Sequence, residues 1–218
     1  MSDRINTISL SELLPRVFAR EEFPHSGIWR RNVELRRGEN YLIESASGGG
    51  KSSLAAFITG GRHDYEGVIG FNGENIRSLT IDDWQQLRRR HLAYLPQELG
   101  LFPGLTAIDN IMLKAELTGD VALPQIEKWM KRLGVDNRRD YPAGKLSIGQ
   151  QQRVALIRSL CQPFDFILLD EPVSHLDEEN NRIAACIVEE EAARREAGII
   201  TFSVGNPLLI SNPVKINL

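Results

Sequence analysis

Residues 45–53 read SASGGGKSS and stand between a strand-like segment and a helical one. The preceding residues 40–44 (NYLIE) suit a strand, and an apolar helical stretch begins at Leu54. Three consecutive glycines let the backbone adopt positive φ angles and bring its N–H groups close around the oxygens of a polyphosphate. The order strand, glycine-rich turn and helix therefore predicts a phosphate-binding loop, with the positive end of the helix dipole facing the anion.

The residue types in this loop have specific expected roles. Lys51 would reach the β and γ phosphates, and the Ser52 hydroxyl would ligate Mg²⁺. The usual pattern, G-x-x-x-x-G-K-S/T, has glycine where this chain has Ser45. A glycine-rich turn before an ordinary helix is the alternative interpretation. The residues expected to contact nucleotide here are Ser45, Ala46, Ser47, Gly48, Gly49, Gly50, Lys51, Ser52 and Ser53.

Length and composition allow several classes of protein and exclude others. The 218 residues suffice for one large domain or one domain with a lobe, and 42% hydrophobic with 25% charged residues is ordinary for a soluble protein. The net charge of −3 gives no basic bias, so we expect no nucleic-acid partner. Neither a signal-peptide core near the start nor a run of eighteen apolar residues is found, so any membrane contact is expected through a partner.

The segments before and after the loop differ in their expected structure. Residues 5–43 alternate short apolar runs with turn signals, which predicts antiparallel strands. Phe23 precedes Lys51 by 28 residues and is a candidate aromatic platform for a nucleobase, with a packing role as the alternative. Strand signals are missing between residues 97 and 146, where two helices are expected, so a helical lobe over about 97–148 is predicted inside an α/β core.

Residues 146–177 carry the second concentration of candidate site residues. A helix is expected from about Gly149, with Ser147 near its N-terminus, where free N–H groups face outward. The apolar strand over 164–169 is followed by Asp170 and Glu171. A carboxylate pair after a buried strand is hard to explain by packing because unpaired buried charge is costly. A metal ligand followed by a general base explains this pair directly.

Taken together and in this order, the motifs resemble those of the nucleotide-binding subunit of an ATP-binding cassette (ABC) ATPase. SASGGGKSS resembles the Walker A loop, and LPQ, ending at Gln97, resembles the Q-loop. LSIGQQQR resembles the signature motif, FILLDEP resembles Walker B, and SHLD at 174–177 resembles the D-loop. The likeness covers nearly the whole chain.

The resemblance implies a role for each matching residue. Gln97 would touch Mg²⁺ and the attacking water and sense a transmembrane partner. Asp170 would bind the metal together with Ser52, and Glu171 would be the catalytic base. The signature residues would cap the γ-phosphate held by the opposite subunit, and a D-loop aspartate would lie at the dimer seam; these are Ser147, Gly149, Gln150 and Asp177.

The resemblance also implies an architecture and a function. The expected fold is a single α/β P-loop NTPase domain over residues 1–218, with a RecA-like mixed-sheet core, an N-terminal antiparallel β subdomain and the inserted helical lobe. The expected activity is Mg-ATP hydrolysis by a homodimer or heterodimer that drives transport through a separate membrane-spanning permease. Such a subunit would be cytoplasmic, held at the inner face of the membrane by its partner.

Several residues depart from the family pattern. Ser45 and Ile148 replace glycines, and His175 stands where alanine is common. Val204 occupies the position of a histidine that contacts the γ-phosphate in the family, which implies reduced turnover. A soluble regulatory or scaffolding ATPase with weak turnover is therefore the alternative to a transport subunit. The chain does not contain the coiled-coil insertion of DNA-repair relatives, which favours transport.

Overall fold

Two β-sheets and six α-helices make up the part of the chain that the structure, a computed structural model, describes: residues 4–20, 23, 25–46 and 48–218. The larger sheet is parallel, in the order β6-β7-β8-β3-β9. Its strands are β3 (Asn40–Glu44), β6 (Leu92–Leu95), β7 (Phe166–Asp170), β8 (Gly198–Ser203) and β9 (Val214–Asn217). The expected mixed α/β fold class is confirmed.

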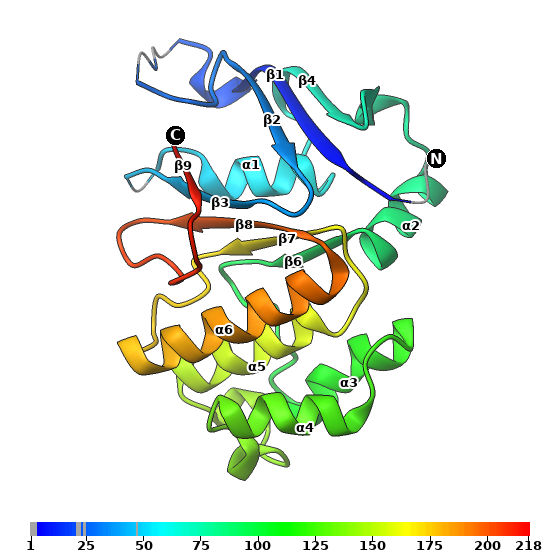
Figure 1. Cartoon of the computed structure of the whole chain (residues 1–218), viewed down its shortest axis with the longest axis vertical. Coiled ribbons are helices and arrows are strands. Elements are labelled where there is room, and N and C mark those ends of the chain that lie inside the picture. Colours follow the sequence, from blue (N-terminus) through cyan, green and yellow to red (C-terminus); the bar gives the residue numbers. More distant parts are fainter. Residues whose placement is uncertain (1–3, 21–22, 24, 47) are drawn as a thin grey trace.

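The smaller sheet is antiparallel and lies above the parallel sheet in Figure 1. Its order is β2-β1-β4-β5, with β1 (Thr7–Pro15), β2 (Asn32–Arg36), β4 (Tyr65–Phe71) and β5 (Glu74–Asn75). Asn72 and Gly73, at φ 50° and 83°, form the tight turn of the β4–β5 hairpin, as the Asn-Gly pair predicts. The antiparallel strands expected near the N-terminus are thus found in one sheet.

Helices cover both faces of the parallel sheet, which explains why its central strands are apolar throughout. Every residue of β7 and β8 is buried. Helix α1 (Lys51–Ile58) packs between the two sheets, and α5 (Ile148–Leu160) and α6 (Glu178–Arg195) lie on the opposite side in Figure 1. Two apolar cores result, one on each face of the parallel sheet.

Local capping sets where several helices begin. Thr80 and Thr106 each form a reciprocal capping box with an aspartate three residues later, at the starts of α2 (Ile81–Arg90) and α3 (Ala107–Thr118). Ser147 and Gln150 form the same box at the start of α5. These hydrogen bonds satisfy N–H groups that the first helical turn leaves free.

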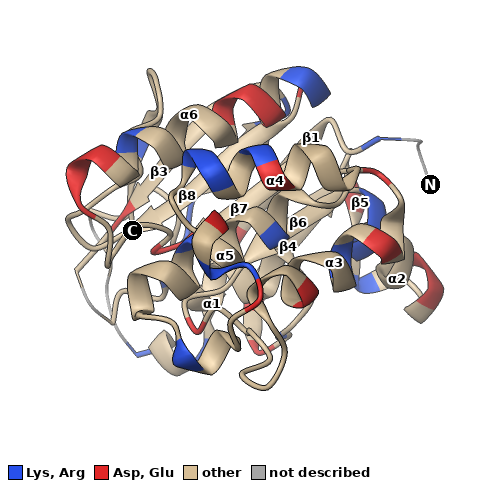
Figure 2. Ribbon diagram, turned by 90° about the horizontal axis from the view of Figure 1, so that it is seen from below, with Lys and Arg blue, Asp and Glu red and all other residues tan. Residues whose placement is uncertain are grey.

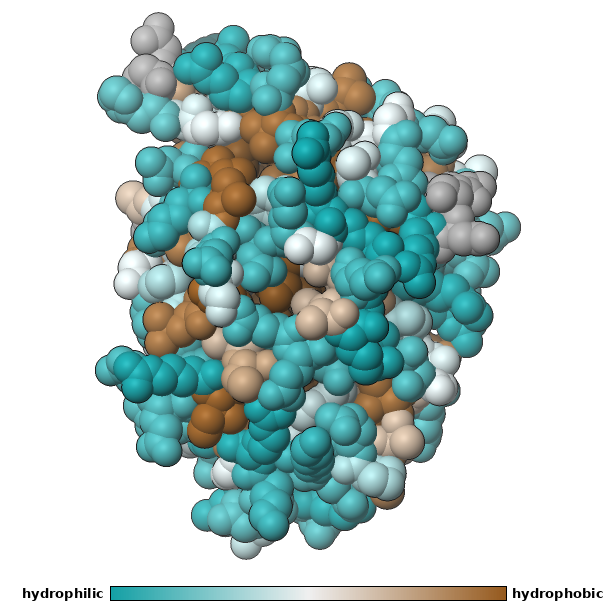
Figure 3. Space-filling model, in the orientation of Figure 1, coloured by the Kyte–Doolittle hydropathy of each residue, from teal (hydrophilic) through white to brown (hydrophobic). Residues whose placement is uncertain are grey.

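Helices α3 and α4 (Leu123–Arg132) lie between β6 and β7 in the chain and below the sheet in Figure 1. Two 3₁₀ turns, Asp136–Arg138 and Ala143–Lys145, complete this segment. The fully buried side chain of Trp129 joins it to the larger core. The ribbon in Figure 2 shows basic and acidic residues interspersed along α4 and α6, and Figure 3 shows separate hydrophobic patches on a largely hydrophilic face.

Candidate functional site

The glycine-rich turn connects the end of β3 to the start of α1 with a backbone that requires glycine. Gly48 and Gly50 have φ angles of 85° and 93°. A Cβ atom on Gly50 would lie 2.9 Å from the Trp29 ring, and one on Gly49 would lie 2.5 Å from the Ser45 hydroxyl oxygen. Trp29 also donates its indole N–H to the carbonyl oxygen of Gly49 at 3.1 Å. The loop is therefore held close to the underlying core, while Ser47 lies outside the described residues.

Lys51 folds back over the loop that precedes it. Its ammonium group donates to the Ser45 hydroxyl at 2.9 Å and to the carbonyl oxygens of Ser45 and Ala46 at 3.0 and 3.2 Å. Burial lowers the pKa of Lys51, and the carboxylates of Glu171 and Asp170 oppose that change. Ser45, which replaces a glycine of the usual pattern, thus contributes both of its oxygens to the contacts of this lysine.

A cavity of about 370 Å³ opens over the loop and collects most of the predicted site residues. Its lining comes from the loop, from the segments after β6, β7 and β8, and from the turn after β1: Val17, Phe18, Gly48, Gly50, Lys51, Ser52, Ser53, Gln97, Asp170, Glu171 and Val204. Segments far apart in the chain therefore meet at one edge of the parallel sheet, where ligands bind in open α/β folds.

The aromatic ring that lines this cavity belongs to Phe18, which the sequence did not single out. Phe23, the residue predicted for this role, packs against Phe18 with ring centroids 5.1 Å apart. The number of residues before Lys51 did not distinguish Phe18 from Phe23, because both lie in the segment between β1 and β2. Trp29 was also missed, since its contact with Gly49 depends on tertiary packing.

Asp170 ends β7 with both carboxylate oxygens buried and without a hydrogen-bond partner among the described residues. Burial raises its pKa, and nearby Ser52 and Lys51 oppose the rise. One carboxylate oxygen of Glu171 is likewise buried and unpartnered, and burial raises the pKa of this residue too, against the effect of Lys51. Two carboxyl groups with buried, unpartnered oxygens are suited to binding a cation and to transferring a proton.

The backbone of Glu171 is strained. Its φ angle is 50°, an uncommon conformation for a residue with a side chain. Its N–H donates to the carbonyl oxygen of Phe202 at 3.1 Å, which ties it to the neighbouring strand β8. This hydrogen bond therefore fixes the position of the Glu171 backbone relative to β8.

The predicted signature residues do not line the cavity of their own chain. Ser147 accepts a hydrogen bond from the Gln150 N–H at 3.3 Å, and the Gln150 side-chain oxygen accepts the Ser147 N–H at 3.0 Å. A Cβ atom on Gly149 would lie 2.8 Å from the carbonyl oxygen of His175. Ile148 is 48% exposed beside them. The signature residues therefore contact one another and the segment at His175.

The remaining candidates are Asp177, His175 and Val204. Asp177 caps α6, where its carboxylate accepts the Asn180 N–H at 2.8 Å, and the Asn180 hydrogen bonds lower its pKa. The exposed His175 places its Nδ1 2.9 Å from the Ser174 hydroxyl oxygen and is not part of the cavity lining. Val204 is 49% exposed at the cavity. The cavity therefore has an aliphatic side chain at the position where the sequence comparison placed a histidine in the family.

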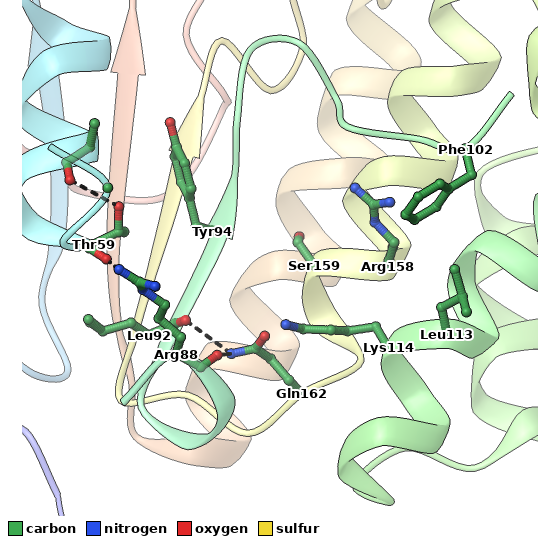
Figure 4. A pocket seen from close by; sticks show the side chains of 12 residues that line it. Thr59, Arg88, Leu92, Tyr94, Phe102, Leu113, Lys114, Arg158, Ser159 and Gln162 are labelled. Atoms are coloured by element: carbon green, nitrogen blue, oxygen red, sulfur yellow. Dashed lines mark hydrogen bonds between the residues drawn. The ribbon is translucent and has the colours of Figure 1, made fainter. Parts of the chain in front are cut away.

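A second, larger cavity of about 520 Å³ opens between α1, β6, α3 and α5 (Figure 4). Apolar side chains form much of its wall, and three cationic side chains reach it, whereas no carboxylate of the described residues lines it. Arg88 donates to the carbonyls of Thr59 and Gly60, and Arg158 to those of Leu99 and Gly100. In Figure 4, Lys114 extends across the opening toward Gln162.

We expect Asp170→Asn to stabilise the chain in the absence of nucleotide and Mg²⁺. Burial raises the folded-state pKa, so the folded chain binds more protons than the unfolded chain, and ionisation of Asp170 lowers stability as pH rises. Removing an unpaired buried charge should raise the free energy of unfolding at pH 7 by about 1–3 kcal/mol. Urea unfolding at pH 7 and near pH 4 measures this gain, which should shrink at the lower pH. Asp177→Asn, at an exposed and hydrogen-bonded carboxylate, should give no gain, and a less stable Asp170→Asn at pH 7 would contradict the analysis.

Comparison with known proteins identifies the family. The ABC transporter family model matches residues 30–174. The ABC transporter ATP-binding protein YtrE of Bacillus subtilis (strain 168) is 32% identical over 176 residues, 79% of this chain and 75% of that protein. The macrolide export ATP-binding/permease protein MacB of Shewanella sp. (strain W3-18-1) is 34% identical over 162 residues, 73% of this chain but only 25% of that protein.

Solved structures agree in fold. The dimeric structure of MJ0796, a bacterial ABC transporter cassette, has a TM-score of 0.75 and 23% identity, covering 90% of this chain and 87% of that one. No helix within the described residues combines the length and apolar character needed to cross a membrane. The order of the motifs, the meeting of the phosphate loop, Gln97 and the carboxylate pair at one sheet edge, and these similarities together show that the chain belongs to the ABC transporter family, as an ATP-binding (ABC ATPase) subunit.

Proposed function

We propose that this subunit binds Mg-ATP in the 370 Å³ cavity and hydrolyses it as a dimer to drive a separate membrane-spanning partner. The observation that carries this proposal is the meeting of the phosphate loop with Asp170, Glu171 and Gln97 around one cavity. The backbone of Gly48 and Gly50 and the N-terminus of α1 supply N–H groups for phosphate oxygens. On binding, Lys51 exchanges its contacts with Ser45 and Ala46 for phosphate oxygens.

The residues at the cavity fit Mg²⁺ as the companion of ATP. Mg²⁺ is commonly held by one or two carboxylates together with substrate phosphates and water, rather than by an all-protein cage. The unpartnered oxygens of buried Asp170 supply the carboxylate, and Ser52 and Gln97 supply neutral oxygens beside it. No cluster of three His, Cys, Asp or Glu side chains that fits a metal is found in the described residues, in keeping with this shared coordination. Bound Mg²⁺ would neutralise phosphate charge.

Glu171 is placed to take a proton from the attacking water. Its pKa is raised by burial, which makes the carboxylate a better base, and one of its oxygens has no hydrogen-bond partner in the described part of the chain. Gln97 lines the same cavity from the segment after β6 and would orient that water. Val17 and Phe18 supply an apolar wall beside the loop for the base or ribose.

The proposed dimer is based on the predicted site residues that do not line the 370 Å³ cavity. Ser147, Gly149 and Gln150 lie outside the cavity of their own chain and present the start of α5. A helix start with an oriented serine is a suitable contact for a phosphate supplied by another subunit. We propose that each nucleotide lies between the phosphate loop of one subunit and these residues of the other, with Asp177 near the seam. Both a homodimer and a heterodimer satisfy this arrangement.

Glu171→Gln should trap this dimer. The substitution removes the base but keeps the size of the side chain, so Mg-ATP should bind without turning over and hold two subunits together. Analytical ultracentrifugation of the variant with Mg-ATP should show a dimer that disappears with EDTA. The control Glu171→Gln with Lys51→Ala should stay monomeric, because loss of the lysine removes a charge-assisted phosphate contact. A monomer in the single variant with saturating Mg-ATP would overturn the homodimer and require a different partner chain.

We expect Val204 to limit the rate of ATP hydrolysis. A donor near the transferring phosphate is commonly worth about 10²–10³ in rate, and valine can neither donate nor accept. The remaining groups, Lys51, Gln97 and Glu171, support slow turnover rather than none. The exposed Val204 side chain at the cavity also favours the second candidate function, an ATP-dependent regulatory or scaffolding subunit.

Val204→His should raise steady-state ATP hydrolysis by about tenfold or more, since it restores a donor at the cavity. His175→Ala should leave the rate unchanged, because His175 does not line the cavity. A wild-type rate already typical of transport ATPases, with no gain in Val204→His, would show that the missing histidine does not limit turnover. No hydrolysis in either protein would favour the regulatory function.

The 520 Å³ cavity is the proposed contact for the membrane partner. It lies beside β6, whose next residues lead to Gln97, so an occupant would sit close to a residue of the nucleotide site. Its apolar wall includes Leu92, Tyr94 and Leu113, and burial with the nearby Arg158 charge lowers the pKa of Lys114. A half-buried cation without a carboxylate in the lining favours an apolar partner segment that carries an acidic side chain.

Lys114→Glu should disrupt the complex with the membrane partner, because the charge reversal opposes an acidic side chain. Co-purification of the two proteins from membranes measures the loss, and ATP binding by the variant should stay within about twofold of wild type. The matched control is Lys131→Glu, at an exposed lysine on α4, which should retain the complex. Equal retention by both variants would exclude this cavity as the contact.

A further inference from the structure

Gln152 forms three hydrogen bonds that connect helix α5 to the segment after β7. Its side chain is buried, with 2% of the residue exposed. The amide nitrogen donates to the carbonyl oxygen of Glu171 at 2.8 Å and to the Ser174 hydroxyl at 3.1 Å. The amide oxygen accepts the N–H of His175 at 3.0 Å. Both amide hydrogens are therefore used, and no methyl-bearing or charged side chain reproduces this set.

The bond to Glu171 acts on a strained part of the chain. With φ at 50°, Glu171 has a conformation that persists only where neighbouring groups enforce it. Its N–H is fixed by strand β8 through Phe202, and its carbonyl oxygen is fixed by Gln152. The two bonds hold the peptide units on both sides of the Glu171 Cα, so they set the direction in which the carboxylate leaves the backbone.

The same segment is packed closely against the start of α5. A Cβ atom on Gly149 would lie 2.8 Å from the His175 carbonyl oxygen, so the two backbones approach as near as glycine allows. On its other side, Asn206 donates its side-chain amide to the Val173 carbonyl oxygen at 3.2 Å. Residues 171–175 thus contact α5 on one side and the segment after β8 on the other.

We propose that Gln152 is a positioning residue that fixes the Glu171 carboxylate and joins it rigidly to the start of α5. This inference rests on the proposed function, in which Glu171 serves one nucleotide and Ser147, Gly149 and Gln150 serve the other. A shift of the α5 N-terminus on contact with the second nucleotide must then move the main chain of Glu171. Gln152 therefore makes turnover at one site depend on occupancy of the other.

The test is Gln152→Met, which keeps the length and burial of the side chain but removes all three hydrogen bonds. We expect kcat to fall by about tenfold or more, because small displacements of a catalytic group are costly, while the dissociation constant for Mg-ATP stays within about twofold. The Hill coefficient for ATP should fall toward one.

The matched control is Asn110→Leu, at a buried amide that lines neither cavity. The Asn110 amide oxygen accepts the Phe102 N–H at 2.8 Å, and its amide nitrogen donates to the carbonyl oxygens of Phe102 and Thr106 at 3.1 and 2.9 Å. The two variants should lose comparable thermal stability, but only Gln152→Met should lose kcat. Equal kcat in both variants would overturn the inference.

Gln152→Glu supplies a second readout. A protonated carboxyl can donate to the Glu171 carbonyl oxygen as the amide does, whereas an ionised carboxylate cannot. The ratio of its kcat to that of wild type should therefore rise as the pH falls. A constant ratio would show that the donated hydrogen bond does not matter for turnover.

Hydrogen exchange separates this inference from the proposed function. In the full chain without nucleotide, amides of residues 171–177 should exchange faster in Gln152→Met than in wild type or Asn110→Leu. Wild type without hydrolysis would contradict the proposed ATPase activity, and the exchange comparison would still decide the role of Gln152. Unchanged protection of residues 171–177 would overturn it.

Discussion

The cost of burying a carboxylate without a partner governs the design of this subunit. Asp170 ends a strand whose every residue is buried, and both of its oxygens lack hydrogen bonds in the described part of the chain. Such a group is unfavourable in the isolated fold, where nearby Ser52 and Lys51 offset part of the cost, and we propose that a bound cation offsets the rest. The apolar strand β7 makes this placement possible, because its packing on both faces stabilises the sheet independently of the charge at its end.

The parallel arrangement of the strands brings further candidate residues to the same edge of the sheet as Asp170. β3 ends at the phosphate loop, β6 leads to Gln97, β7 ends at Asp170 and β8 leads to Val204. Parallel strands end at one edge, so four segments that are distant in sequence supply the same cavity. The antiparallel sheet and the turn after β1 add Phe18 beside it. Chemistry here depends on strand order more than on any single loop.

Sequence predicted best those features that arise from local interactions. The helices expected between residues 97 and 146 depend on such interactions, because α3 begins at Thr106, whose capping partner Asp109 lies three residues later. The phosphate loop and the carboxylate pair were recognisable because their spacing is fixed by one strand and one turn. Phe18 and Gln152 were not, since their partners lie far away in the chain and only the packed fold brings them together.

The departures from the family pattern differ in their physical consequences. Ser45 fits because Gly49 has no Cβ to meet its hydroxyl, and that hydroxyl becomes a partner of Lys51. Ile148 lies exposed beside Ser147 and Gly149 without disturbing the capping box of α5. Val204 places an aliphatic side chain in the cavity lining, where the family resemblance implies a histidine. We therefore propose that the departure at Val204 lowers the rate of hydrolysis more than the affinity for nucleotide.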